Sequence, residues 1–164
     1  MGHHISAIIG KDTIDKEKIK EFGLAVAFEN GYAIVLLDFY AMCELAELLD
    51  KSTDSDSENI DWDCKLTYFI AKEIGLENFA LIQTDYFAGI GDQYASYFEK
   101  SIKIINEVSI NEVLNRLGVE KKNELDEFDT INLTEYRNTE FYYKKNNNWA
   151  DKRDNMIAGR ILNN

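Results

Sequence analysis

The chain has 164 residues, 45% of them hydrophobic, which suits a single domain with one sizeable core. Its 30 acidic and 18 basic side chains give a net charge of −12, which argues against nucleic acid and anionic membranes as partners and favours a basic protein. No apolar run approaches the roughly 20 residues of a membrane span, and the start lacks the pattern of a secretion signal, so we expect a cytoplasmic protein.

The charge is distributed unevenly along the chain. Residues 1–135 hold 12 basic and 27 acidic side chains, whereas residues 136–164 hold 6 and 3. We therefore expect one domain over residues 1–164, with residues 136–164 as a basic C-terminal extension. Cys43 and Cys64 are the only cysteines. Their spacing suggests neither a disulfide framework nor a zinc site, so we expect two reduced, buried thiols.

The first third of the chain predicts a strand, a helix and a hairpin. Residues 3–10, "HHISAIIG", are rich in strand-forming side chains. Residues 13–23 have a helical pattern, with Thr13 as the expected N-cap and Gly23 as the stop. Two apolar runs flank an Asn-Gly pair, so strands are expected near residues 24–29 and 33–38.

Two further helices and a strand are predicted in the middle of the chain. Apolar residues at helical spacing indicate a helix over 40–50, which the polar loop 51–59 interrupts. A second helix is expected over 65–75, ending at Gly75. The run "FALIQTDYF", residues 79–87, then predicts a strand.

The segment 93–108 is interpreted as two strands that turn at Glu99 and Lys100, with a helix over 93–105 as the alternative. A helix follows over 109–118, because Ser109 and Glu112 form a capping box and a C-cap glycine comes at its end. Beyond it we expect an edge strand near 140–145 and a terminal helix near 150–162. The order of elements predicts a single α+β domain, with helices packed on a mixed or mostly antiparallel sheet.

The stretch "TDYFAGIGDQ", residues 84–93, resembles a glycine-rich phosphate loop only superficially. The third glycine of a dinucleotide fingerprint is missing, and Asp92 would repel a phosphate. Gly89 and Gly91 instead suggest a tight reversal with positive φ on both sides of Ile90, whose side chain would point inward. Such a turn would bring Asp85, Tyr86, Asp92 and Gln93 close together.

Catalytic and metal sites receive little support from the sequence. A small enzyme remains the alternative reading, with a pocket built from His3 or His4 and from Asp85, Tyr86 and Gln93. Consecutive histidines on a strand point to opposite faces and cannot bind one metal together; "MGHH" also fits a truncated purification tag. The acidic loop has the spacing that starts an EF-hand, but it lacks the glycine and the final glutamate. We expect no metal and no cofactor.

Two segments, "GHHISAIIG" and "FALIQTDYFAGIGDQYASYF", resemble a group of small uncharacterised bacterial proteins. These proteins have a Met-Gly-His-His start and a TDYFGG-V/I-G-E/D-Q turn. The chain has Ala88 where the group usually has glycine and Asp92 where glutamate is common. Small acidic proteins of this sort resemble immunity proteins, and the resemblance therefore implies an inhibitor of a toxin encoded beside it.

The sequence thus favours a binding protein over an enzyme, and most of all an immunity-type inhibitor of a basic bacterial toxin domain. The expected binding surface combines acidic side chains with two aromatic anchors: Asp54, Asp56, Glu58, Asp61, Trp62, Asp63, Glu124, Asp126, Glu127, Phe128 and Asp129. Carboxylates on one face would steer a basic partner. A third interpretation is a self-assembling protein that uses the aromatic run 140–143 as an edge.

Overall fold

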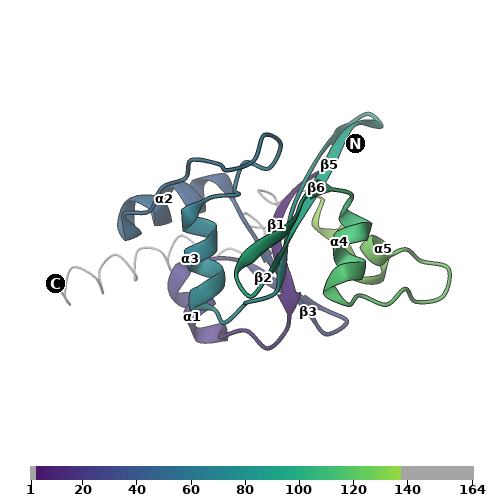
Figure 1. Cartoon of the computed structure of the whole chain (residues 1–164), viewed down its shortest axis with the longest axis horizontal. Coiled ribbons are helices and arrows are strands. Elements are labelled where there is room, and N and C mark those ends of the chain that lie inside the picture. The colour runs from purple at the N-terminus through teal and green to yellow at the C-terminus, as the bar shows by residue number, and fades with distance from the viewer. Residues whose placement is uncertain (1–2, 138–164) are drawn as a thin grey trace.

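The computed structural model of the chain describes residues 3–137. This part of the chain forms one antiparallel sheet with helices on both of its faces (Figure 1). The predicted single-domain α+β class is therefore confirmed, and the sheet is antiparallel throughout the described residues.

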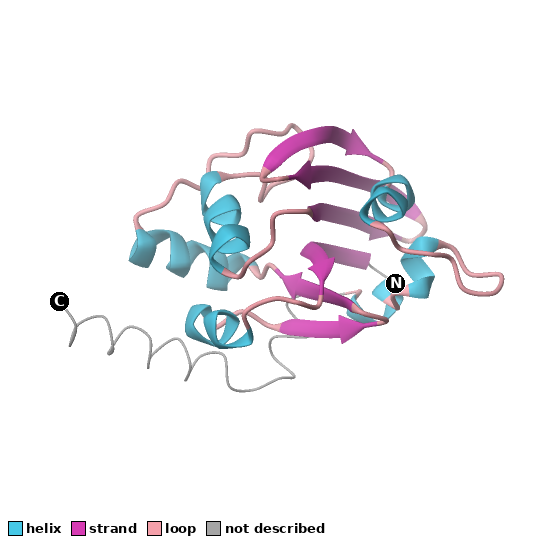
Figure 2. Ribbon diagram, turned by 60° about the horizontal axis from the view of Figure 1, so that its bottom comes forward, coloured by secondary structure: helices cyan, strands magenta, loops and turns pink. Residues whose placement is uncertain are grey.

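The first strand of the described sheet lies near its centre, and hairpins extend the sheet on both sides (Figure 2). The strand order is β2-β3-β1-β4-β5-β6. Short turns join β2 to β3, β4 to β5, and β5 to β6. The strands are β1 (His3–Lys11), β2 (Val26–Glu29), β3 (Tyr32–Leu36), β4 (Phe79–Phe87), β5 (Ile90–Glu99) and β6 (Ile102–Val108).

The helices divide into two groups, which define the two faces of the sheet (Figure 1). The α3 face carries α1 (Lys16–Phe22), α2 (Phe39–Leu49) and α3 (Lys65–Glu73), and the α4 face carries α4 (Ile110–Leu117), α5 (Glu127–Thr130) and the 3₁₀ helix η1 (Leu133–Tyr136). Neighbouring residues of β5 show the division. Phe98 packs against Tyr68 of α3, whereas the guanidinium group of Arg116 in α4 lies 5.9 Å from the ring centre of Tyr97.

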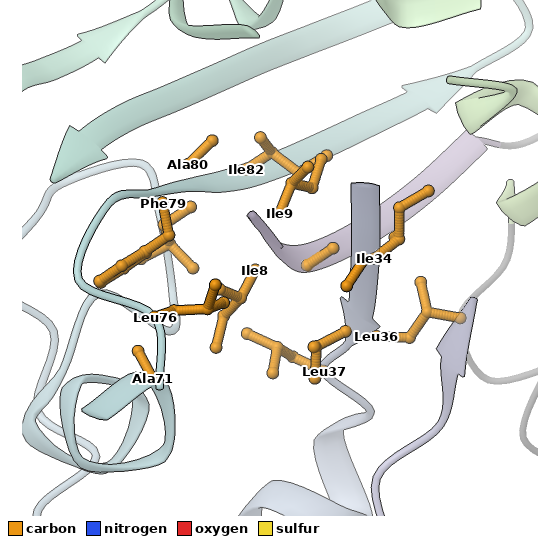
Figure 3. Packing of buried hydrophobic residues seen from close by; sticks show 14 of the residues in the cluster. Ile8, Ile9, Ile34, Leu36, Leu37, Ala71, Leu76, Phe79, Ala80 and Ile82 are labelled. Atoms are coloured by element: carbon orange, nitrogen blue, oxygen red, sulfur yellow. The ribbon is translucent and has the colours of Figure 1, made fainter. Parts of the chain in front are cut away.

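Helices on both faces explain why the central strands are apolar at consecutive positions. Ile8 and Ile9 of β1 point to opposite faces, and both are completely buried. Figure 3 shows Ile9 beside Ile82 of β4, and Ile8 beside Leu76 and Leu37. On the α3 face Phe79 stacks on Phe98, with ring centres 4.6 Å apart. The apolar runs of the sequence therefore belong to one core that surrounds the sheet.

Two of the predicted hairpins are present. Asn30 and Gly31 have φ values of 49° and 85°, as the predicted Asn-Gly hairpin requires. The β5–β6 hairpin is also confirmed, and the helical alternative for this segment is wrong. Its turn residues are Lys100 and Ser101, one position later than predicted, and both adopt positive φ.

The predicted helices are present, with one change of cap. Asp15, not Thr13, caps α1, because its carboxylate accepts a hydrogen bond from the backbone of Lys18 at 3.1 Å. Ser109 caps α4 as expected, and Gly118 ends that helix in the left-handed conformation. No helix within residues 3–137 has the length and apolar character that crossing a bilayer requires.

The expectation about the cysteines is wrong in part, and the expectations about the C-terminal segments lie outside the described residues. Cys43 is exposed on α2, so the prediction of two buried thiols is wrong for this residue, although Cys64 is buried. The predicted edge strand near 140–145, the terminal helix near 150–162 and nearly all of the basic extension 136–164 lie outside the described residues, as does the aromatic run 140–143.

Candidate functional site

The glycine-rich turn is the tip of the β4–β5 hairpin. Ala88 and Gly89 are its two turn residues, with φ values of 52° and 79°. Phe87 and Ile90 pair directly across it, beyond the edge of the core, and Ile90 is 81% exposed. The expectation that Ile90 points inward is therefore wrong. Gly91 is needed for another reason: a β-carbon there would overlap the backbone carbonyl of Asp85.

The hairpin sorts its polar residues onto the two faces of the sheet. Asp85 pairs with Asp92, so both carboxylates lie on one face, and His4 of β1 pairs with Asp85 on its other side. The Nδ1 atom of His4 is 4.0 Å from a carboxylate oxygen of Asp85. Tyr86 and Gln93 occupy alternate positions and face the other way.

The alternative catalytic set is therefore only partly assembled. His4 and Asp85 are neighbours on the α3 face, as expected if the first strand adjoins the turn. His3 pairs with Tyr86 in the ladder. Tyr86 and Gln93 lie on the opposite face from His4 and Asp85, so the sheet divides the set.

The acidic segment 51–64, here called the acidic loop, is held against the α3 face at several points. The backbone N–H of Asn59 donates to Glu107 of β6 at 2.6 Å, and that of Asp61 donates to Gln83 of β4 at 2.8 Å. Trp62 is only 8% exposed. Trp62 was expected to be a surface anchor, but its ring contributes to the core instead.

Asp63 is the buried anchor of the acidic loop. Its carboxylate is completely buried and accepts hydrogen bonds from Ser57, from the hydroxyl of Tyr68 and from the ammonium group of Lys103. Burial, and then the hydrogen bond to Asp63, raise the pKa of Tyr68 well above its ordinary value. Because Asp63 is enclosed, it cannot form part of an exposed acidic surface.

The remaining carboxylates of the loop do face solvent. Asp54, Asp56, Glu58 and Asp61 are all exposed. Asp56 accepts a hydrogen bond from Tyr68 at 3.1 Å. Among residues 3–137, no cation forms an ion pair with Asp54, Glu58 or Asp61. The loop therefore presents uncompensated negative charge.

The second acidic stretch lies on the other side of the sheet. Asp126 caps α5 and also accepts a hydrogen bond from Asn111 of α4 at 3.1 Å. Glu127 is only 4% exposed and is 3.8 Å from Lys121. Phe128 is half-buried, and Asp129 and Glu124 are exposed. Because α5 lies on the α4 face, the two acidic stretches do not form one surface.

The sequence interpretation missed an exposed aromatic pair at the start of α2. Phe39 and Tyr40 are 62% and 61% exposed, and their rings meet edge to face with centres 5.5 Å apart. Phe39 also lies against Trp62, with ring centres 6.1 Å apart. The helical spacing of the sequence indicates that this pair is exposed. The buried residues of α2 include Met42 and Leu45, whereas Phe39, Tyr40 and Cys43 lie on a different side of the helix.

A cavity of about 510 Å³ opens between the aromatic pair, β1 and the acidic loop. Phe39, Tyr40 and Trp62 supply its aromatic lining, and the polar lining includes His4, Asp38, Cys43 and Asp61. Within the described part of the chain, no three His, Cys, Asp or Glu side chains are grouped so that they could hold a metal ion. Aromatic rings beside carboxylates are suited to a cationic or amphipathic group.

The chain has no significant match among protein-family models, curated proteins or solved structures.

Proposed function

We propose that the protein is an acidic protein-binding module and, specifically, an immunity-type inhibitor of a basic bacterial toxin domain. The observation that carries the proposal is the exposed Phe39–Tyr40 pair beside the exposed carboxylates of the acidic loop. Neither feature is explained by the core, and Asp61 of the loop lines the same cavity as the aromatic pair.

The two features have different roles in binding. Uncompensated carboxylates attract a basic partner over a Debye length of about 8–10 Å and raise its association rate. Exposed aromatic rings supply contact area at low entropic cost and slow dissociation once they are desolvated. Asp61 can serve in both steps, association and retention of the partner. It is exposed on the loop, and it lines the cavity together with the aromatic pair.

The test uses a basic toxin domain encoded beside the gene, or a partner captured from lysate at low salt and released at high salt. The triple variant Asp54→Asn/Glu58→Gln/Asp61→Asn should mainly lower the association rate, and added salt should have the same effect on the unaltered protein. Phe39→Ala should mainly raise the dissociation rate. Surface-immobilised binding kinetics measure both rates, with circular dichroism as the folding control. Association rates that respond neither to salt nor to the triple variant would exclude this surface as the binding site.

One observation favours a second candidate, a small thiol-dependent enzyme. Cys43 and His4 line the same cavity, and Asp85 lies 4.0 Å from the Nδ1 atom of His4. A thiol, an imidazole and a carboxylate in this order can supply an activated nucleophile. Hydrolysis of ester or amide substrates that Cys43→Ser and His4→Ala both abolish, in folded protein, would favour this function over binding.

A further inference from the structure

We propose that the cavity between α2, β1 and the acidic loop is a receptor for one arginine side chain of the partner. This inference rests on the proposed function, and it identifies the chemical group that the partner contributes at the centre of the contact.

The lining of the cavity has the two components that recognise a guanidinium group. Phe39, Tyr40 and Trp62 present aromatic surface, and the negative face of an aromatic ring attracts a cation. Asp61 supplies an exposed carboxylate, and the buried carboxylate of Asp38, which caps α2, adds negative charge beside it. The described ion pairs leave Asp61 without a cation, so an incoming guanidinium group would provide the missing positive charge.

The cavity favours arginine over lysine on physical grounds. A guanidinium group is planar, stacks on aromatic rings and loses hydration more readily than an ammonium group. It can also donate several hydrogen bonds in one plane to a carboxylate. A volume of about 510 Å³ lies in the range of small-molecule sites, so the cavity has room for the guanidinium group and part of its aliphatic stem.

The rigid surroundings of the cavity support a preformed site. The carboxylate of Asp38 accepts a hydrogen bond from the backbone of Ala41 at 3.1 Å, which fixes the start of α2 and its aromatic pair. On the opposite wall, the backbone N–H of Asp61 donates a hydrogen bond of 2.8 Å to the side-chain oxygen of Gln83, which holds the loop in place. A site that is ordered before binding loses less entropy when it binds.

Cys43 provides a direct reporter for the test. It is exposed and lines the cavity, whereas Cys64 is completely buried, so a small neutral reagent such as 4,4′-dithiodipyridine should modify Cys43 selectively in the folded protein. The probes are N-acetylarginine amide, N-acetyllysine amide and N-acetylcitrulline amide. Citrulline keeps the shape of arginine but carries no charge.

The arginine probe should slow the modification of Cys43 several-fold in a saturable way, the lysine probe should do so less, and the citrulline probe should have almost no effect. Asp61→Asn and Phe39→Ala should each weaken this protection, whereas Glu120→Gln, an exposed change beyond α4, should not. Equal protection by arginine and citrulline, equal protection by arginine and lysine, or no protection at saturating probe would each overturn the proposal.

The outcome is separable from that of the proposed function. If the arginine probe fails while salt and the loop variants still alter partner association, only the arginine receptor is wrong. If the arginine probe protects Cys43 while no partner responds to salt or to the loop variants, the cavity is a site for small cationic ligands and the inhibitor function is wrong.

Discussion

At the scale of single residues, the cluster around Asp63 is the least expected feature. A fully buried carboxylate is costly unless charge and hydrogen bonds compensate it. Here Lys103, Tyr68 and Ser57 provide that compensation, and the side chain of Lys103 is itself only 24% exposed. The cluster joins the acidic loop to α3 and β6.

Removing the cation should therefore be strongly destabilising. Lys103→Met is expected to lower the free energy of unfolding by about 3–5 kcal/mol, because it leaves Asp63 buried without a counter-charge. The double variant Asp63→Asn/Lys103→Met should recover part of that loss. Urea denaturation of both variants measures the difference, and equal stability of Lys103→Met and the unaltered protein would show that Asp63 is not buried as a charge.

The raised pKa of Tyr68 gives a prediction for alkaline pH. The folded state holds the phenol neutral, whereas the unfolded state releases its proton near pH 10, so stability is complete below pH 10 and falls as pH rises above it. Tyr68→Phe should be less stable at neutral pH, but its stability should decline less steeply above pH 10. Unfolding free energies measured from pH 8 to about pH 11 test this slope.

Two glycines in one hairpin provide a matched comparison. Gly89→Ala places a side chain at positive φ in open space and should cost about 1 kcal/mol. Gly91→Ala should cost more, because its new methyl group would overlap the backbone of Asp85. Thermal denaturation of the two variants should rank them in this order, and the reverse order would contradict the hairpin geometry.

At the scale of elements, the acidic loop combines a buried side with an exposed side. Trp62 and Asp63 attach it to the core, and its remaining carboxylates face solvent. Hydrogen bonds from Asn59 to Glu107 and from Asp61 to Gln83 attach the loop further to the sheet. A charged stretch held in this way loses less entropy on binding.

Because the indole ring of Trp62 is buried, its removal should affect the stability of the fold. Trp62→Ala should lower the free energy of unfolding by about 3–5 kcal/mol, because it leaves a cavity where an indole ring was buried. Tyr40→Ala, which removes an exposed ring nearby, should change stability by about 0.5 kcal/mol or less. Chemical denaturation compares the two, and similar effects would show that the indole ring is not packed as described.

The sequence predicted the elements better than it predicted their exposure. Asn30-Gly31, the caps of α4 and the apolar runs identify turns, ends and strands, because these signals act locally. The burial of Asp63 could not be predicted, because its counter-charge on Lys103 lies 40 positions away. The burial of Trp62 likewise depends on tertiary packing, which places its ring against Phe39 of α2. Phe39 and Tyr40 could have been identified from their helical spacing, but their position beside the acidic loop required the tertiary fold.

At the scale of the whole molecule, the sheet separates two acidic surfaces. The acidic loop lies on the α3 face, and the exposed acidic residues of the α4 face surround α4 and α5. Only the first surface adjoins the exposed aromatic pair and the cavity. The negative charge of the chain alone therefore does not identify the binding face.

A charge-matched pair of variants tests this distinction. Glu112→Gln/Glu120→Gln/Glu124→Gln removes three exposed charges from the α4 side, as many as the loop variant Asp54→Asn/Glu58→Gln/Asp61→Asn removes from the acidic loop. The loop variant should slow partner association much more than the α4-side variant. If the two triple variants slow association equally, net charge and not the acidic loop governs the encounter.

The central position of β1 also bears on how the chain is made. β1 pairs with both β3 and β4, and in the second pairing Ile5 lies opposite Thr84. During synthesis at about 5–20 residues per second, β1 therefore waits for many residues before its second neighbour exists. In that interval the backbone N–H and C=O groups along one edge of β1 have no ladder partners. Folding of this sheet is thus expected to depend on late, long-range pairing, and the nascent chain should interact with chaperones until β4 has emerged from the ribosome.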